Sequence, residues 1–244
     1  MARHRLYIAQ PVIAGRSLRI EGETAHYLVR VLRLRQGDEV ALFDNSGVEF
    51  PATVTDIGKQ RADLLPGDAV CRDLESPLDI RLIQGVSRGE RMDLVVQKAT
   101  ELGIRRISPV LTAHSVVRLD AERASRRQEH WNRIAQSACE QCGRNRLPAI
   151  DEPRPLADFL QEPSAAGLRL LLHPAPGIDL AQVDAPASVD LLIGPEGGLS
   201  DDERELARNM GFASLRMGPR ILRTETAALA AIAMLQSRWG DFQA

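Results

Sequence analysis

After Leu78 the chain alternates between short apolar stretches and longer stretches in which apolar residues recur at helical spacing, and this alternation limits its fold most. "DIRLIQGV" is typical of a buried strand, and the residues from Met92 to Leu102 then show helical spacing until Gly103. We predict further strands in "IRRISPVL", "LRLLLHP", "VDLLIGP" and "ASLRMG", helices through "QEHWNRIAQSACEQCG" and over 224–239, and a surface connection over 151–167. The pattern predicts an α/β fold with a mostly parallel sheet and helices on both faces.

Up to about residue 70 the chain has a different rhythm, with short apolar stretches separated by turn signals such as "DNSG" at residues 44–47. We predict a small β-barrel or sandwich with one short helix near "TAHYLVRVLR", capped by Thr24. The polar stretch "VCRDLESP" separates the two rhythms. We therefore predict two domains, residues 1–72 and 73–244.

The composition allows a globular protein and argues against several classes. With 244 residues and 44% hydrophobic residues, the chain can fill a sizeable core. No apolar run approaches the roughly 20 residues that span a bilayer. The start "MARHRLYIAQ" lacks the apolar stretch of a signal peptide, so we expect a cytosolic protein.

The cysteines and histidines do not predict a metal or disulfide site. Three cysteines are an odd count for a disulfide framework, and "CEQC" has no second pair to complete a zinc site. A redox role favours thiols at a helix N-terminus, whereas Cys139 and Cys142 lie near a predicted helix end. His26, His114 and His173 lack the spacing of metal ligands. We expect structural cysteines and no metal.

The charge distribution indicates an anionic partner despite a net charge of −2. The first 35 residues contain only two acidic residues, Glu21 and Glu23. The same stretch holds seven arginines, which are Arg3, Arg5, Arg16, Arg19, Arg30, Arg33 and Arg35. A local excess of this kind favours binding to nucleic acid more than the net charge suggests.

Three loops follow the late predicted strands and have unusual compositions: "LLHPAPG", "LLIGPEGGLSDDE" and "RMGPRILRTET". In parallel sheets ligands bind beyond the carboxyl ends of the strands, so these loops are candidates for one pocket. Ser200 and Glu203 form a predicted capping box that starts a helix. The glycine-rich turn lacks the features of a Walker loop or a dinucleotide fingerprint. Its Glu196, followed by two aspartates, fits a cofactor with a positive centre, and an ordinary tight turn remains the alternative.

Two other features leave alternatives open. Lys98 and Glu101 lie beside the apolar stripe of their helix; Glu101 fits an ordinary solvated residue, and Lys98 fits a solvated or a functional one. The alanine-rich helix "TAALAAIAMLQ" permits close packing, either within the core or at a dimer interface.

Several motifs together resemble the bacterial 16S ribosomal RNA (uracil-N3)-methyltransferases of the SPOUT superfamily. The strongest are "LLIGPEGGLSDDE" and, about twenty residues on, "LRMGPRILRTETAALAAIAMLQ". "QKATELGI", "EQCGRN", "RLYI" and "HYLVRVLRLRQGDEVALFDNSG" are also similar to that family's motifs. The similarity keeps its order over nearly the whole chain.

The resemblance implies a PUA-like β-barrel that helps hold RNA, followed by a SPOUT-type α/β domain with a C-terminal trefoil knot. It also implies a homodimer with the active site near the subunit interface. The implied cofactor is S-adenosylmethionine, held by the three loops. The corresponding residues here are Leu172, His173, Ile193, Gly194, Pro195, Glu196, Gly197, Gly198, Met217, Gly218, Ile221 and Leu222.

The implied reaction is methylation of the N3 of one uridine in the 16S RNA of the small ribosomal subunit. Because N3–H is a weak acid, transfer requires removal of a proton and stabilisation of negative charge on the carbonyl oxygens. We hypothesise that Arg220 or Arg223 donates to the uracil edge or its phosphate, and that Glu225 orients an arginine or passes the proton. The expected phosphate contacts are Arg3, Arg5, Arg30, Arg33, Arg88, Lys98 and Arg144. We identify no aromatic stacking partner for the target base.

Three rival functions stay open at this stage. One is a SPOUT methyltransferase with another acceptor, such as a ribose 2'-hydroxyl. Another is a non-catalytic RNA-binding assembly factor, although such a scaffold does not require the polar cluster around Arg223 and Glu225. A nucleotide-dependent oxidoreductase predicts a dinucleotide fingerprint, which "IQGVSRGE" is not.

Overall fold

The computed structural model describes residues 4–115 and 120–242, which form two compact units. Unit 1 contains residues 4–75 and the later segment 139–147, and unit 2 contains the other described residues. The linear split that we predicted did not include the return of 139–147 to the first unit.

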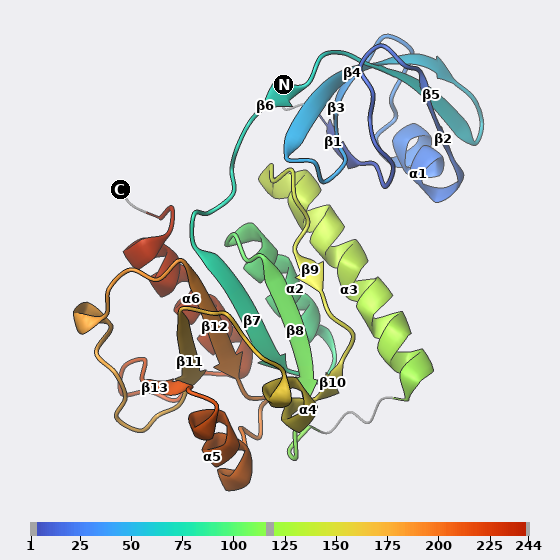
Figure 1. Ribbon diagram of the computed structural model, residues 1–244. Helices are drawn as coiled ribbons and strands as arrows, with labels where there is room; N and C mark the ends of the chain where they lie inside the picture. The colour runs from blue at the N-terminus through green and yellow to red at the C-terminus, as the bar shows by residue number, and fades with distance from the viewer. Residues whose placement is uncertain (1–3, 116–119, 243–244) are drawn as a thin grey trace. The chain divides into compact units, whose positions relative to one another are not determined.

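Unit 1 is built on a sheet of six strands that curls around one apolar core (Figure 1). The strands run in the order β1-β3-β4-β5-β2, and β6 pairs with β4. They are β1 (His4–Tyr7), β2 (Leu18–Glu21), β3 (Glu39–Phe43), β4 (Val48–Ile57), β5 (Arg61–Pro66) and β6 (Val70–Cys71). Helix α1 (Gly22–His26) continues into a π-helical turn over Tyr27–Val31.

Two local predictions in unit 1 had different outcomes. The predicted turn "DNSG" is confirmed, because it joins the antiparallel strands β3 and β4, and Asn45 and Gly47 have φ of 71° and 97°. The predicted cap at Thr24 was wrong. The helix begins at Gly22 after Glu21, which makes no side-chain capping bond, so Thr24 lies inside the helix.

Unit 2 contains a seven-stranded sheet in which all strand pairs are parallel, as predicted. The order is β10-β8-β7-β12-β11-β13, and β9 pairs with β8. The strands are β7 (Asp79–Gly85), β8 (Arg106–Leu111), β9 (Ala149–Ile150), β10 (Arg154–Pro155), β11 (Leu168–Leu172), β12 (Ser188–Ile193) and β13 (Ala213–Leu215). The helices are α2 (Glu90–Glu101), α3 (Ala121–Cys142), α4 (Leu156–Gln161), α5 (Asp201–Asn209) and α6 (Thr224–Trp239), with a short 3-10 turn at Leu180–Gln182.

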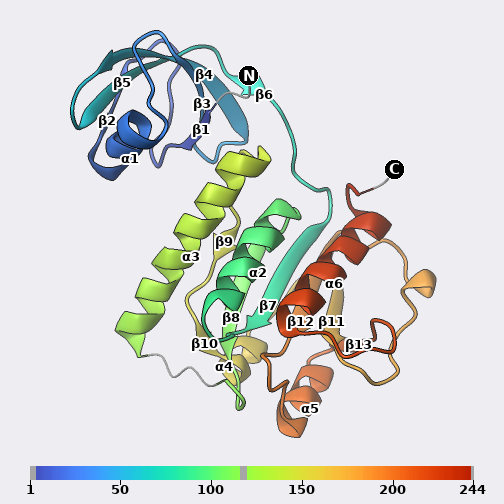
Figure 2. The ribbon, with the colours of Figure 1, turned by 180° about the vertical axis from the view of Figure 1, so that it is seen from behind.

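Helices cover both faces of this sheet because neighbouring residues of each strand point to opposite faces. Leu82 and Leu191 pack with α2, α3 and α6, whereas Ile83 and Leu192 pack with α4 and α5. Helices α2 and α6 lie side by side on their face (Figures 1 and 2). The connecting loops are therefore left at the edges of the sheet, where a site can form.

One prediction for unit 2 was wrong. The segment 151–167, expected to be a surface connection, contains β10 and α4. Leu156, Phe159 and Leu160 are buried against the sheet. The prolines around this six-residue helix hide its short apolar pattern in the sequence. Among the described residues, no helix has both the length and the apolar character needed to cross a membrane.

Candidate active site

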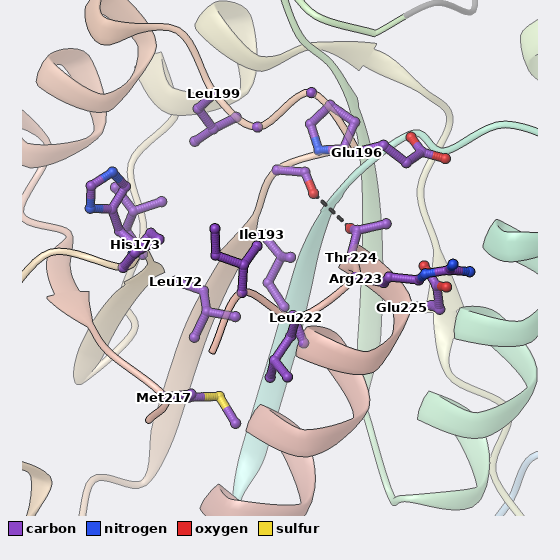
Figure 3. Close-up of a pocket in the computed structure, with 18 of the residues that line it drawn as sticks. Leu172, His173, Ile193, Glu196, Leu199, Met217, Leu222, Arg223, Thr224 and Glu225 are labelled. Atoms are coloured by element: carbon purple, nitrogen blue, oxygen red, sulfur yellow. Dashed lines mark hydrogen bonds between the residues drawn. The ribbon is translucent and has the colours of Figure 1, made fainter. Parts of the chain in front are cut away.

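Three loops of unit 2 meet at one edge of the sheet. Strands β11, β12 and β13 are parallel neighbours, so the loops after Leu172, Ile193 and Leu215 leave from the same edge. The loops line a pocket of about 610 Å³ (Figure 3). Apolar side chains such as Leu172 and Met217 gather on one side of it, and Glu196 and Glu225 lie on the other.

The structure brings together the residues that the sequence pointed to. All twelve predicted cofactor residues line this pocket, as do Arg220, Arg223 and Glu225. The lining also includes residues that sequence reasoning missed, namely Arg91, Leu171, Pro174, Leu199, Arg204, Thr224 and Ala227. The role of each residue in cofactor binding or catalysis remains a prediction. All fifteen predicted cofactor and catalytic residues nevertheless line one cavity.

The glycine loop, residues 194–198, is compact, and other parts of the chain closely surround Gly194 and Gly197. The Gly198 N–H donates to the Pro195 carbonyl across 2.9 Å. A Cβ on Gly194 would lie 3.0 Å from the Gly198 carbonyl carbon, and one on Gly85 would lie 2.5 Å from the Pro195 nitrogen. The loop therefore requires glycine both within itself and at the end of β7.

Thr224 ties this loop to the start of helix α6. Its hydroxyl donates to the Gly194 carbonyl across 2.7 Å and accepts from the Gln84 side-chain nitrogen at 3.0 Å (Figure 3). Gln84 is fully buried at the end of β7. In the sequence Thr224 is typical of a helix start, and its bond to a loop thirty residues earlier has no local signal.

Glu196 is engaged by the chain itself. Its Oε1 accepts from the Arg91 guanidinium at 2.5 Å and from the Arg88 N–H at 3.2 Å. Partial burial raises the pKa of Glu196, but the hydrogen bonds from its own backbone, from Arg91 and from Arg88 outweigh burial and hold the pKa below its ordinary value. We expected the negative charge of Glu196 to face a positively charged cofactor. Arg91, which lies 105 residues away in sequence, neutralises part of that charge.

A capped helix start at Ser200 and a neutral His173 lie on the same side of the pocket as the glycine loop. The predicted capping box is confirmed, since the Ser200 hydroxyl accepts from the Glu203 N–H and the Glu203 carboxylate accepts from the Ser200 N–H. Burial, with Arg204 and Arg208 nearby, lowers the pKa of His173. Because His173 Nδ1 accepts from the Ala175 N–H at 3.1 Å, the neutral ring carries its proton on Nε2.

The other wall is open and charged. Arg220 and Arg223 are exposed, and Ile221 between them is 89% exposed. Glu225 Oε2 is buried and has no hydrogen-bond partner among the described residues. An anionic or acidic ligand can therefore reach two arginines beside a carboxylate oxygen that still has capacity to accept a proton or hydrogen bond.

The predicted phosphate contacts lie in different environments. Arg3 lies outside the described residues. Arg30, Arg33 and Arg88 are exposed, whereas Lys98 pairs with Glu101 at 2.8 Å.

Two of the predicted contacts need correction. The Arg144 side chain is only 4% exposed and pairs with Glu75 at 2.6 Å, and Arg5 is 10% exposed and pairs with Glu49. Arg5 also donates to the Arg144 carbonyl at 3.0 Å and to Asn145 Oδ1 at 2.7 Å, so both arginines hold unit 1 together. Neither has a free guanidinium to offer a phosphate.

The cysteines form no disulfide. Cys139 is buried, and its hydrogen bond with Cys142 and its burial raise its pKa far above the ordinary value, which leaves an unreactive thiol. Across residues 4–115 and 120–242 no three histidine, cysteine or acidic side chains gather as metal ligands.

The fold and the pocket define an α/β enzyme with a cofactor-sized site at the carboxyl edge of its parallel sheet. Residues 74–236 match a family model described as an RNA methyltransferase domain, and residues 20–66 match one described as an RNA methyltransferase PUA domain. The chain belongs to the RNA methyltransferase family that these two models describe, and its N-terminal domain is PUA-like.

Relatives and solved structures agree with this assignment. The ribosomal RNA small subunit methyltransferase E of Buchnera aphidicola (subsp. Acyrthosiphon pisum) is 32% identical over 98% of this chain and 95% of its own length. A methyltransferase from Legionella pneumophila, solved with bound SAM, is 38% identical, with a TM-score of 0.95 over 99% of this chain and 100% of its own. The Neisseria gonorrhoeae ribosomal RNA small subunit methyltransferase E bound to S-adenosyl methionine is 37% identical, with a TM-score of 0.94 over the same shares.

Proposed function

We propose that this protein uses S-adenosylmethionine to methylate the N3 of one uridine in the 16S RNA of the small ribosomal subunit. The proposal rests on one pocket, where the three loops similar to that family's motifs meet beside the exposed Arg220 and Arg223. Glu225 Oε2 also lies there and has no hydrogen-bond partner among the described residues. The full-length likeness to the small subunit methyltransferases E supports the RNA acceptor. The relatives' bound SAM supports the cofactor.

The pocket suits this cofactor in size and chemistry. Its volume of about 610 Å³ lies within the roughly 300–1,000 Å³ of small-molecule sites. Leu172, Ile193 and Leu222 offer apolar surface for an adenine ring and a methionine chain. With Glu196 held by Arg91, Glu225 is the carboxylate of the pocket best able to face a positive sulfonium.

The chain's own residues provide the groups that the reaction requires. S-adenosylmethionine, when bound, supplies a methyl group activated by the sulfonium. Glu225 Oε2 accepts the N3 proton, which lets N3 act as the nucleophile. Arg220 or Arg223 donates to the uracil carbonyl oxygens, on which negative charge develops. Since no ion pair links Glu225 to either arginine in the described residues, proton acceptance suits Glu225 better than orientation of an arginine.

The test is methyl transfer from labelled S-adenosylmethionine to 30S particles that lack the modification, with the product nucleoside identified by mass spectrometry. We expect 3-methyluridine at a single site. A 2'-O-methylated product would replace the proposed acceptor, and cofactor binding without transfer would point to another RNA. Absence of cofactor binding would favour a non-catalytic RNA-binding role.

We also propose that unit 2 contains a trefoil knot and that the protein acts as a homodimer in the cytosol. The close approach of Gly177 to Ser214, where a Cβ would lie 1.9 Å from the Ser214 carbonyl oxygen, supports tight threading of these segments. Ile221, 89% exposed beside the pocket, suits a subunit interface. Stretching the unfolded chain tests the knot, because a knotted chain stays shorter than about 3.4 Å per residue. Sedimentation equilibrium tests the dimer.

The RNA contacts now proposed are Arg30, Arg33 and Arg88, with Lys98 weaker because of its pairing with Glu101. We propose that unit 1 holds RNA through Arg30 and Arg33, and that unit 2 contains the catalytic pocket together with the contacts Arg88 and Lys98. Phosphate contacts make binding fall as salt rises. Binding of 30S particles that is insensitive to salt would contradict these contacts.

A further inference from the structure

A segment with several exposed arginines and an exposed tyrosine follows helix α1 in unit 1. The position of α1 is labelled in Figure 1. We call this segment the arginine turn and define it as Tyr27, Arg30, Val31, Arg33 and Arg35. Its three arginines are exposed, the Tyr27 side chain is 41% exposed and Val31 is 60% exposed. An exposed aromatic ring and three exposed cationic side chains therefore lie within nine residues of sequence.

The arginine turn is fixed by the core beneath it. Leu28 and Leu34 are buried in the core of unit 1, and the Leu34 N–H donates to the Leu28 carbonyl at 3.1 Å. Tyr27–Val31 is π-helical, a conformation that concentrates at functional sites. Arg33 has φ of 55°, in the left-handed region that non-glycine residues seldom adopt. The backbone thus presents these side chains in a defined arrangement.

The arginines of the turn differ from four other arginines of unit 1, which are paired with carboxylates. Arg19 pairs with Asp63 at 2.8 Å and Arg61 with Asp56 at 2.9 Å, and Arg5 and Arg144 are paired as described above. In the part of the chain that the structure describes, no carboxylate lies within ion-pair distance of the three arginines of the turn. Asp38 is the first acidic residue that follows Arg35 in the sequence, and its carboxylate accepts a hydrogen bond from the Arg35 backbone N–H at 2.7 Å.

We infer that the arginine turn binds an unpaired stretch of RNA, with phosphates on its arginines and one base stacked on Tyr27. Unneutralised guanidinium groups beside an aromatic face are the combination that binds single strands, because each base has a face to stack and each nucleotide a phosphate. In a duplex the bases are stacked on one another and cannot cover Tyr27. The inference rests on the proposed RNA acceptor, and it adds the form of RNA and a residue, Tyr27, that sequence reasoning did not identify.

The test uses the full chain and a fluorescent oligouridylate of roughly ten nucleotides, with binding followed by anisotropy. We expect Y27A to weaken binding by about tenfold and Y27F, which keeps the ring, to bind like the wild type. R30Q/R33N/R35Q should lower the slope of log affinity against log salt by about two. Asparagine is chosen at 33 because it tolerates the left-handed conformation.

Matched controls come from the same unit. R16Q/R19Q/R61Q removes three exposed arginines elsewhere, two of them ion-paired, and L65A truncates an apolar residue of 42% exposure. Both should bind the oligonucleotide nearly as the wild type does. Thermal unfolding of every variant checks that it is folded. Equal losses in both arginine triples, unchanged binding by Y27A, or equal affinity for a duplex of the same length would overturn the inference.

The same variants separate this inference from the proposed function. Methylation of 30S particles with a raised KM in Y27A supports both. Oligonucleotide binding that depends on Tyr27 in a wild type that methylates no uridine supports the arginine turn and contradicts the proposed function. Wild-type methylation with an unchanged KM in both Y27A and the arginine-turn triple contradicts the arginine turn alone.

Discussion

The two loops that line most of the pocket are held in opposite ways. The glycine loop, residues 194–198, is tied to four other segments through Gly85, Arg91, His114 and Thr224. Within the part of the chain that the structure describes, the side chains of loop 216–223 make one hydrogen bond, from Arg216 to the Gly218 carbonyl at 3.3 Å. The arginines of this loop face solvent.

The difference suggests a division of labour between the substrates. A loop whose backbone is fixed in advance suits a small cofactor, since little ordering is needed on binding. An open loop with free guanidinium groups suits a large polyanion, which supplies the missing contacts itself. We therefore expect changes in the fixed loop to alter cofactor affinity and changes at Arg220 and Arg223 of the open loop to alter turnover.

The largest effect is expected from a change in the open loop, residues 216–223. R223A should lower kcat by about 10² to 10³ because it removes a donor to the developing negative charge. Affinity for S-adenosylmethionine, measured by calorimetry, should stay nearly constant, and R220A serves as the comparison. Equal losses of turnover and cofactor affinity would contradict the role of Arg223 as a donor to the uracil.

The next effect is on the fixed side. In G85A the new Cβ would lie 2.5 Å from the Pro195 nitrogen, so the glycine loop must move. We expect cofactor affinity to fall by about tenfold or more, because a displaced loop loses the preorganisation that favours binding. P219A, in the exposed open loop, is the control and should bind the cofactor normally. Normal binding by G85A would show that the loop is less constrained than its contacts indicate.

A smaller effect is expected where the two loops are joined. T224V leaves the Gly194 carbonyl and the Gln84 amide without a shared partner, at a cost of about 1–3 kcal/mol in the free energy of unfolding. T224S keeps the hydroxyl and should recover most of it. Urea denaturation measures the stability of both variants. Equal stability of T224V and T224S would show that the hydrogen bonds of the Thr224 hydroxyl do not stabilise the fold.

The smallest effect concerns acid stability. Since the folded protein lowers the pKa of His173 below its ordinary value of 6.5, the unfolded chain binds this proton more readily. The stability from neutral His173 is present above that value and is lost as the pH falls through the folded pKa. H173Q should therefore lose less stability than the wild type between about pH 7 and pH 5 in urea denaturation. An unchanged pH dependence would contradict the shift.

Much of the fold was predictable because periodicity and turn chemistry are local. The parallel sheet, the capping box at Ser200 and helix α6 all followed from residues a few positions apart. The missed helix α4 shows the limit, because six residues between prolines are too few for a clear period. The misplaced cap at Thr24 has a related cause, since a threonine inside a helix and one before it look alike in sequence.

By itself the sequence determined which loops form the pocket, because the order of strands and loops along the chain dictates what leaves the carboxyl edge. Only the tertiary structure decided which charges are free. It paired Glu196 with Arg91 and buried Arg144 against Glu75. Within the described ranges it left Glu225 Oε2 without a hydrogen-bond partner. Ion pairs between residues far apart depend on how the elements pack, and no local pattern encodes that packing.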